Sequence, residues 1–312
     1  MHQTISHFFG SHSSTYLAAS GFEARSPITG EVIAHVKKHS AAEASHIIET
    51  AVNDARVWRD VPMPVRGRLI GIFGEILRRH KNALADIVTL EAGKIISEAR
   101  GEVQEMVDIA EYAVGLSRQI GGTIFSSELS KHLLQERWHP KGVVGIISAF
   151  NFPVAVWMWN LALSVVCGNC NLWKPSEKTF VCAIACDHLW QAACAEFTKE
   201  TGIVVPKGVS QLLLGNRDIG QIMVADKRVA LISATGSCAI GEKIQSEVAK
   251  TLGRTCLLEL GGNNAVVITP SAPMPLTLES TLFGAMGTAG QRCTTTRRLL
   301  IHQSRFDALW PH

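Results

Sequence analysis

The sequence has no excess of either charge and few charged residues altogether. Lysine and arginine number 30 against 27 aspartates and glutamates, and charged side chains make up only 18% of the 312 residues. A disordered chain would be more polar and more highly charged. Nucleic acid as the main partner would require a basic excess. The composition therefore favours a folded protein that does not bind nucleic acid, and the length allows roughly two domains of about 150 residues.

The N-terminus lacks the pattern of a secretory signal peptide. Residues 1–16 are polar, without a basic segment followed by an apolar run. The eight cysteines lie mostly within apolar runs, which favours reduced thiols and a cytoplasmic location. Cys167 and Cys170 have C-x-x-C spacing. The cysteines that follow, Cys182 and Cys186, lie on an apolar predicted helix without other ligand types, so we expect neither a metal nor a redox site.

One long stretch lacks charge entirely. Residues 142–173 contain no Asp, Glu, Lys or Arg and are long enough to span a bilayer. Asn151, Pro153, Asn160 and Asn171 interrupt the stretch, and short β-rich runs flank a helical middle. We therefore interpret it as a buried strand, helix and strand, and expect no membrane span.

Periodicity predicts the organisation of the chain. Apolar residues recur at helical spacing over residues 41–60 and 64–118, whereas residues 122–140 predict an extended arm or hairpin. Apolar runs then alternate with helices. The predicted strands are 143–149, 171–174, 210–214 and 229–234, and the predicted helices are 153–167, 179–195, 218–224 and 238–252. This alternation favours an α/β fold with a doubly wound parallel sheet covered on both faces.

A second α/β unit is predicted to start after Gly261. It consists of a strand over 265–269, a helix over 275–286, a loop before Cys293, a strand over 298–302 and the first turns of a helix over 304–309. Ligands of doubly wound sheets bind at the carboxyl ends of the strands. The loops of interest are therefore 149–153, 174–178, 215–218 and 234–241.

No G-x-G-x-x-G fingerprint follows any predicted strand, which excludes a standard Rossmann pyrophosphate loop. The segment Gly236-Ser-Cys-Ala-Ile-Gly241 follows an apolar strand and opens a helix. Small residues and a helix N-terminus there favour an anion. An ordinary strand-to-helix turn explains the same pattern, so both interpretations remain open.

Cys293 and Glu259 are the candidates for chemistry. Cys293 follows a glycine-containing loop beside Arg292, and a cationic neighbour with local N–H groups lowers a thiol pKa. Glu259 stands at the end of an apolar strand, where desolvation would raise its pKa toward the range of a general base. The alternatives are an inert core cysteine and a carboxylate paired with an arginine.

Five motifs in this order resemble the aldehyde dehydrogenase superfamily, from about residue 15 to 309. They are Ala149-Phe-Asn-Phe-Pro153, Trp173-Lys-Pro-Ser-Glu177, Gly236-Ser-Cys-Ala-Ile-Gly241, Leu258-Glu-Leu-Gly-Gly262 and Gly290-Gln-Arg-Cys293. The segments 112–118, 259–264 and 287–295 look most like the branch that oxidises α-aminoadipic semialdehyde in lysine catabolism. Where the family usually has Gly-Ser-Thr, this chain has Cys238 after Gly236 and Ser237.

The resemblance implies a chemistry. Cys293 would attack the aldehyde carbon, and the amide of Asn151 with the backbone N–H of Cys293 would stabilise the oxyanion. Hydride would pass to NAD, and Glu259 would activate the water that hydrolyses the thioester to the carboxylate. Glu105 and Arg292 would anchor the polar end of an amino-dicarboxylic semialdehyde.

The resemblance also implies an NAD site. Lys174 and Glu177 would meet the adenosine ribose, where Glu177 would repel a 2′-phosphate and so favour NAD over NADP. Ser237 and the helix after Gly236 would face the pyrophosphate. The remaining implied cofactor contacts are Ser148, Ala149, Phe150, Gly215, Gly241 and Leu260.

The resemblance implies a domain division as well. Residues 1–124 and 143–260 would form the NAD-binding domain, 125–142 an extended oligomerisation arm, and 261–312 the N-terminal part of a catalytic domain. Family members continue past the nucleophile for roughly another domain and form homodimers or homotetramers. We therefore expect a C-terminally truncated aldehyde dehydrogenase. The alternatives are an inactive remnant of such an enzyme and a cysteine hydrolase that cleaves esters through Cys293.

Overall fold

A five-stranded parallel sheet forms the centre of the computed structural model, which describes residues 5, 8, 9 and 16–309. The strand order is β7-β6-β5-β8-β9, and each neighbouring pair is parallel. The bounds are β5 Val143–Ile147, β6 Cys170–Lys174, β7 Ser210–Leu212, β8 Val229–Gly236 and β9 Thr255–Leu260. The predicted α/β fold and its strands are confirmed, and the almost wholly buried strands β5 and β6 lie inside the sheet rather than at its edges.

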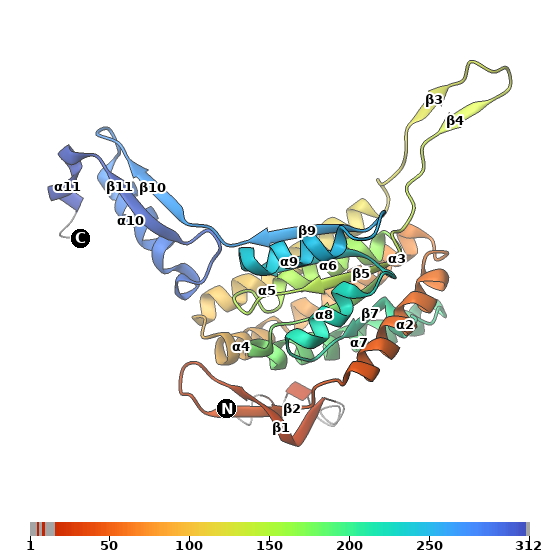
Figure 1. Ribbon diagram of the computed structural model, residues 1–312, viewed down its shortest axis with the longest axis horizontal. Helices are drawn as coiled ribbons and strands as arrows, with labels where there is room; N and C mark the ends of the chain where they lie inside the picture. The colour runs from red at the N-terminus through yellow and green to blue at the C-terminus, as the bar shows by residue number, and fades with distance from the viewer. Residues whose placement is uncertain (1–4, 6–7, 10–15, 310–312) are drawn as a thin grey trace.

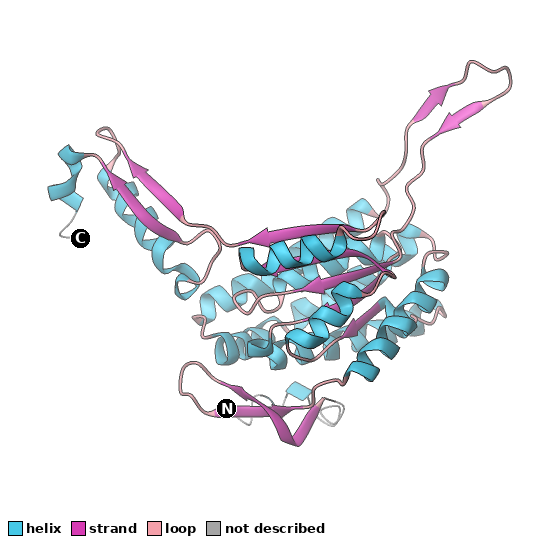
Figure 2. Cartoon of the chain, in the orientation of Figure 1, coloured by secondary structure: helices cyan, strands magenta, loops and turns pink. Residues whose placement is uncertain are grey.

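Two layers of helices enclose the sheet (Figure 2). Helices α2, α8 and α9 pack together on one face, while α6 and α7 cover the other and are backed by α3, α4 and α5. Their bounds are α2 Ala41–Trp58, α3 Met63–Arg79, α4 Lys81–Ala92, α5 Ile96–Leu116, α6 Ala155–Val166, α7 Phe180–Thr201, α8 Arg217–Ala225 and α9 Cys238–Val248. The uncharged stretch thus forms β5, α6 and β6, as predicted, and none of the described helices is long and apolar enough to cross a membrane.

Aromatic packing fixes α6 against the sheet. Trp157 of α6 stacks on Trp173 of β6 with ring centroids 4.4 Å apart, and Phe73 of α3 meets Trp157 edge-on. Helix α7 runs beyond its predicted end at residue 195, because Gly202 supplies the left-handed conformation that terminates it. Helix α9 ends before its predicted limit at residue 252.

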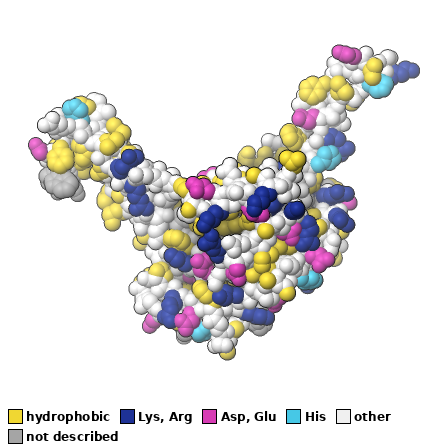
Figure 3. Space-filling model, viewed as in Figure 1, with side chains coloured by type: hydrophobic (Ala, Val, Ile, Leu, Met, Phe, Trp, Pro, Cys, Tyr) yellow, Lys and Arg dark blue, Asp and Glu magenta, His cyan; other side chains and the backbone are white. Residues whose placement is uncertain are grey.

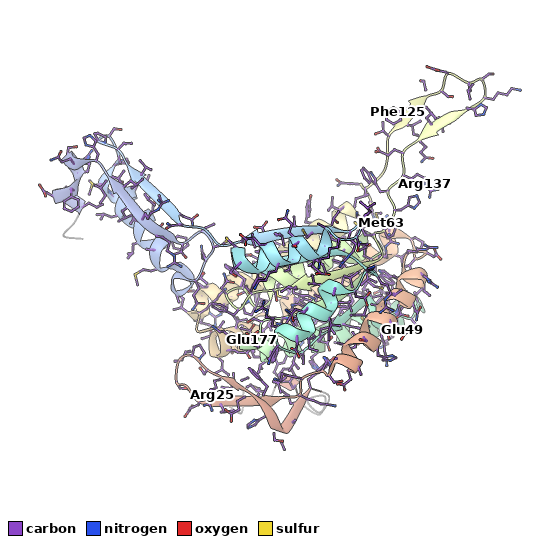
Figure 4. The ribbon with its side chains drawn as sticks, viewed as in Figure 1. Arg25, Glu49, Met63, Phe125, Arg137 and Glu177 are labelled. Carbon is purple, nitrogen blue, oxygen red and sulfur yellow. The ribbon has the colours of Figure 1, made fainter. Side chains whose placement is uncertain are left out.

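Two hairpins extend from this body. Strands β1 (Leu17–Arg25) and β2 (Val32–Val36), which the sequence patterns did not predict, form an antiparallel pair along one side. Strands β3 (Ile124–Ser126) and β4 (Leu133–Gln135) project away from the body (Figure 1), as predicted for an extended arm. Every residue of β3 and β4 is exposed, and Figure 4 shows Phe125 on the projecting part.

The C-terminal unit continues outward from β9. It pairs β10 (Asn264–Ile268) in parallel with β11 (Thr296–Ile301) and includes α10 (Met274–Met286), the 3-10 turn η4 (Gly287–Gly290) and α11 (Gln303–Leu309). Alternate side chains of β9 are exposed, so the expectation of a sheet covered on both faces is wrong at this edge. The unit lies beyond the carboxyl end of β9 (Figure 1), and Cys293 follows its 3-10 turn η4.

Candidate active site

The loop before Cys293 is held in an uncommon backbone conformation. Thr288 and Ala289 have φ angles of 57° and 52°, in the left-handed region that residues with a Cβ rarely adopt. Thr288 is buried, and its backbone N–H donates a 2.8 Å hydrogen bond to Oε1 of Glu98 on α5. Its hydroxyl accepts a 2.8 Å bond from Nε of Arg292. Buried polar contacts thus stabilise the turn that leads to the candidate nucleophile.

Hydrogen bonds also fix the backbone at Cys293 itself. Nδ2 of Asn264 donates to the carbonyl oxygen of Cys293 at 2.6 Å and to that of Thr295 at 3.2 Å. The backbone N–H of Arg292 donates to the buried Thr295 hydroxyl at 2.9 Å. The thiol of Cys293 is exposed, so the alternative of an inert core cysteine does not apply. Asn264 was missed as a site residue, although its Asn-Asn dipeptide stands directly after the Gly-Gly of a recognised motif.

Asn151 lies close to the same loop. It follows β5, and its Nδ2 donates a 2.8 Å hydrogen bond to the carbonyl oxygen of Gln291, two residues before Cys293. An amide nitrogen carries two hydrogens, so a second donor remains on this side chain. The structure therefore brings together two predicted loops that are 140 residues apart in the sequence.

A buried ion pair lies under the Asn151 loop. Nζ of Lys94 contacts Oε2 of Glu102 at 2.5 Å, with both side chains 1% exposed. The other oxygen of Glu102 accepts from the backbone N–H groups of Val154 and Ala155, at 2.8 and 3.1 Å, at the start of α6. Lys94 also lies over the ring of Phe152, 3.8 Å from its centroid. The sequence reasoning had assigned no role to Lys94, Glu98 or Glu102.

Glu259 does not occupy the apolar environment expected for it. The side chain belongs to the exposed set of β9, so the predicted desolvation is wrong. The alternative of an arginine partner also fails within the described part of the chain, where no ion pair of Glu259 is found. Glu259 nevertheless stands near the end of β9, five residues before Asn264, whose amide donates to the carbonyl oxygen of Cys293.

The candidate anchor Arg292 is paired with an acidic residue of α5. Its guanidinium lies 3.6 Å from Glu98 and packs over the ring of Phe283, 5.0 Å from the centroid. Glu105, the other predicted anchor, is exposed two turns further along α5. Partial burial and the charge of Glu102 raise the pKa of Glu105, and the positive charge of Arg292 opposes that shift. The two predicted anchors are therefore close enough for the charge of Arg292 to affect the pKa of Glu105.

A cavity of about 790 Å³ lies between α8 and α9. Its walls include Lys174 and Glu177 from the end of β6 and the turn that follows it, together with Arg217 and Lys243 from the two helices. Figure 3 shows charged side chains around a hollow on this face of the central body, and Figure 4 places Glu177 toward the end to which the strands point. Lys174 is buried 3.5 Å from Glu177, and burial lowers its pKa.

The strand-to-helix turn at residues 236–241 borders this cavity through Ile240. Ser237 caps α9, and its hydroxyl accepts from the N–H of Ile240. A Cβ at Gly241 would stand 2.7 Å from the methyl groups of Leu260, so a glycine lets α9 approach β9 closely. Gly236 and Gly241 thus form a compact turn between strand and helix, as expected for a phosphate site and for an ordinary turn alike.

The other predicted cofactor contacts fall in two places. Gly215 lies in the loop between β7 and α8, whose helix walls the 790 Å³ cavity. Ser148, Ala149 and Phe150 follow β5, where the buried Ser148 hydroxyl accepts from Nε1 of Trp173 at 2.8 Å. Phe150 lines a second cavity of about 330 Å³ beside β1. The predicted contacts are therefore not gathered into one cavity.

Glu91 lies on the wall of the second cavity. Its carboxylate is buried and accepts from the N–H groups of Val181 and Cys182, at 2.9 and 2.7 Å, at the start of α7. Burial raises its pKa to about 7 despite these bonds. The carboxylate stabilises a helix N-terminus, a role that its position inside an apolar run of α4 did not indicate.

The cysteine pair with C-x-x-C spacing is surrounded by protein. Cys170 is buried, Cys167 is half-buried, and burial raises the pKa of both thiols. All eight cysteines are free. Among the residues that the structure describes, no group of three or more His, Cys, Asp or Glu side chains is placed to hold a metal ion.

Comparison with curated proteins places this arrangement among known sequences. The chain is 46% identical over 281 residues to alpha-aminoadipic semialdehyde dehydrogenase of Bos taurus, covering 90% of this chain and 51% of the relative. It is 43% identical over 281 residues to the protein of the same name from Rattus norvegicus, with 90% and 51% covered. The chain thus spans about half the length of the curated relatives it matches.

Solved structures agree on the fold. Glyceraldehyde-3-phosphate dehydrogenase GapN from Methanocaldococcus jannaschii, complexed with NADP, superposes with a TM-score of 0.88 at 27% identity, covering 95% of this chain and 62% of that one. A point mutant of betaine aldehyde dehydrogenase from Staphylococcus aureus, in complex with NAD+, gives a TM-score of 0.86 at 27% identity, with 93% and 57% covered. The profile of the aldehyde dehydrogenase family matches residues 16–311. The chain therefore belongs to the aldehyde dehydrogenase family.

Proposed function

We propose that this chain carries the cofactor site and the nucleophile of an NAD-dependent aldehyde dehydrogenase. The observation that supports this most directly is the 2.8 Å hydrogen bond between Asn151 and the carbonyl of Gln291. It holds an amide donor beside the loop of an exposed thiol, which is the arrangement that nucleophilic attack on an aldehyde requires. Because the chain spans about half of its relatives, the activity of the whole protein is part of the proposal.

The proposed mechanism starts at Cys293. Its thiolate attacks the aldehyde carbon to give a thiohemiacetal, and the remaining N–H of the Asn151 amide donates to the oxyanion as it forms. Asn264 fixes the Cys293 carbonyl, so the thiol is presented from one backbone position. Loss of a hydride from the thiohemiacetal, which a bound nicotinamide would accept, would leave a thioester on Cys293. Glu259 would act as the general base for the water that hydrolyses this thioester to the carboxylate and frees the thiol, and its exposure leaves it open to that water.

Residues at the 790 Å³ cavity fit a nicotinamide dinucleotide. The Lys174–Glu177 pair lies where ribose hydroxyls need a donor and an acceptor, and the capped start of α9 offers N–H groups to a pyrophosphate. When bound, the nicotinamide supplies the hydride acceptor. Glu177 favours NAD, since its negative charge opposes a 2′-phosphate. The neighbouring structures bind NADP in one case and NAD+ in another.

We propose α-aminoadipic semialdehyde as the substrate. The relatives from Bos taurus and Rattus norvegicus carry the name of that activity, and Arg292 places a cation one residue before the nucleophile. Arg292 and Glu105 would bind the amino acid end of this substrate, a carboxylate and an ammonium group respectively.

The same proposal includes a domain division, a homo-oligomer and a cytoplasmic location. Residues 1–124 and 143–260 would form the NAD-binding domain, 261–312 part of the catalytic domain, and 125–142 an arm for a homodimer or homotetramer. The exposed apolar side chains Ile124, Phe125, Leu133 and Leu134 support a partner for the arm. Free thiols at all eight cysteines support a cytoplasmic location.

Nicotinamide reduction tests the proposal. The purified chain is mixed with NAD+ or NADP+ and α-aminoadipic semialdehyde, and absorbance is followed for wild type and Cys293→Ala. Turnover with NAD+ that is lost in Cys293→Ala, with NAD+ affinity retained, is the expected result. NAD+ binding without turnover would indicate an inactive remnant, and cleavage of an ester without cofactor would indicate a hydrolase. A preference for NADP+ would contradict the role given to Glu177.

A further inference from the structure

Helix α5 contributes two carboxylates to the loops of the site, and the proposed mechanism uses neither of them. Glu98 and Glu102 lie four residues apart within Ile96–Leu116, so they share one face of the helix one turn apart. Each accepts backbone N–H from a different segment: Glu98 from Thr288, which precedes Cys293, and Glu102 from Val154 and Ala155, which follow Asn151.

Glu98 holds the turn before the nucleophile. It accepts from the N–H of Thr288 at 2.8 Å and lies 3.6 Å from the guanidinium of Arg292, which in turn donates to the Thr288 hydroxyl at 2.8 Å. These contacts close a small network around Thr288 and Ala289, whose left-handed conformation is costly without compensation. The partner of Glu98 lies 190 residues along the chain, so α5 and the nucleophile loop meet only through the fold.

Glu102 holds the segment after Asn151. One carboxylate oxygen accepts from Val154 and Ala155 at 2.8 and 3.1 Å, and the other contacts Lys94 at 2.5 Å. The carboxylate thus caps α6, whose first residues fix the end of the loop that carries Asn151. A buried ion pair contributes little net stability, because desolvation offsets the attraction. We therefore interpret the Lys94–Glu102 pair as a means of orienting the Glu102 carboxylate, whose hydrogen bonds fix the backbone at Val154 and Ala155.

The two networks converge at one hydrogen bond. Asn151 stands just before the segment that Glu102 holds, and its amide donates to the carbonyl oxygen of Gln291. Gln291 directly follows the turn that Glu98 holds. We propose that Glu98 and Glu102 are positioning residues that make α5 the common support of the nucleophile loop and the Asn151 loop. The distance between thiol and oxyanion donor would then be set by the fixed spacing of one helical turn. This inference rests on the proposed roles of Cys293 and Asn151.

Hydrogen exchange on the whole chain tests the inference without requiring turnover. Amide exchange is followed by mass spectrometry in wild type, Glu98→Ala, Glu98→Gln, Glu102→Ala and Glu102→Gln. Arg100→Ala, an exposed position on the same helix, is the matched control. Glutamine keeps one acceptor oxygen for the backbone N–H groups. At Glu98 this oxygen is the only one that the Thr288 N–H uses, whereas at Glu102 the new NH2 group faces Lys94 and leaves that buried ammonium without its counter-charge. Melting temperatures are recorded for every variant.

We expect two separate local effects. Glu98→Ala should speed exchange in residues 286–293, and Glu102→Ala in residues 150–156, each by about tenfold or more, because a hydrogen bond to a charged group is lost. Glu98→Gln should return exchange to within about threefold of wild type, Glu102→Gln should restore it only in part because Lys94 loses its counter-charge, and Arg100→Ala should change neither segment. If Glu102→Ala does not fold, Glu98→Ala and the glutamine variants carry the test.

Turnover of the aldehyde, where wild type shows it, supplies a second reading. Both alanine variants should lower kcat by about tenfold and leave KM for NAD+ within about twofold, as expected when only the geometry of the chemical step changes. Exchange that rises evenly over the chain, or that Glu98→Gln fails to restore, would overturn the inference. Wild type without turnover would count against the proposed function alone, because the exchange comparison still decides the role of α5.

Discussion

Different interactions stabilise the central sheet and the C-terminal unit: apolar burial in the first, and hydrogen bonds in the second. Strands β5 and β6 are buried almost throughout, and Trp157 and Trp173 stack between α6 and the sheet. Helix α10 of the C-terminal unit has no buried residue, and Cys293 is exposed. The nucleophile loop is instead fixed by hydrogen bonds to α5 and Asn264. Apolar burial thus builds the scaffold, and directional polar contacts set the geometry of the candidate site.

Truncation of one aromatic side chain in each region should show this difference most strongly. Trp157 is 1% exposed, so Trp157→Ala should lower the free energy of unfolding by about 4 kcal/mol through lost burial and a cavity. Phe283 of α10 is 60% exposed, so Phe283→Ala should lower the free energy of unfolding by no more than about 1 kcal/mol, through its contact with Arg292. Urea denaturation with unchanged slopes measures both values. Equal losses would mean that the C-terminal unit is packed as tightly as the sheet.

The pH dependence of stability should be governed by the scaffold, through Glu91. Burial raises its pKa from 4.5 to about 7, so the folded chain binds this proton more tightly than the unfolded chain. The stability contributed by Glu91 is then full below about pH 4.5 and is lost as the pH rises through about 7.

Glu91→Gln isolates this effect, because glutamine keeps an acceptor for α7 and carries no proton to lose. Between pH 5 and pH 8, wild type should lose about 2 kcal/mol of stability relative to Glu91→Gln, measured by denaturation at each pH. Asp187, whose pKa burial raises to about 6, is present in both proteins and cancels in the difference. Parallel stability curves for the two proteins would contradict the assignment.

The scaffold was more predictable from the sequence than the contacts of the site. Alternating apolar runs and helices predicted the parallel sheet, because a strand buried on both faces must be apolar along its whole length. Strands β1 and β2 were missed, since Leu17–Arg25 is mostly exposed and has no regular apolar alternation. The burial expected for Glu259 was wrong because alternate side chains of β9 face outward.

The motifs located Asn151 and Cys293, but not what holds them. Glu98 and Glu102 find their backbone partners 190 and 52 residues away, so no local pattern reveals the contacts. Acidic residues one turn apart on an amphipathic helix were the available signal, and solvated side chains show the same spacing. Their meaning depends on the packing of α5 against segments that the fold alone brings near.

Relief of backbone strain in the nucleophile loop should change stability less than the loss of Trp157 or the titration of Glu91. Ala289 is exposed with a φ of 52°, so Ala289→Gly removes an unfavourable Cβ without removing a contact of the core. The melting temperature should rise by a few degrees, which corresponds to about 1 kcal/mol. Replacing alanine by glycine inside a helix has the opposite effect and lowers stability. Alanine at Gly71, within α3, provides the reference for an ordinary helical site, since a Cβ there makes only van der Waals contact at 3.5 Å. A lower melting temperature for Ala289→Gly would contradict the strain assigned to Ala289.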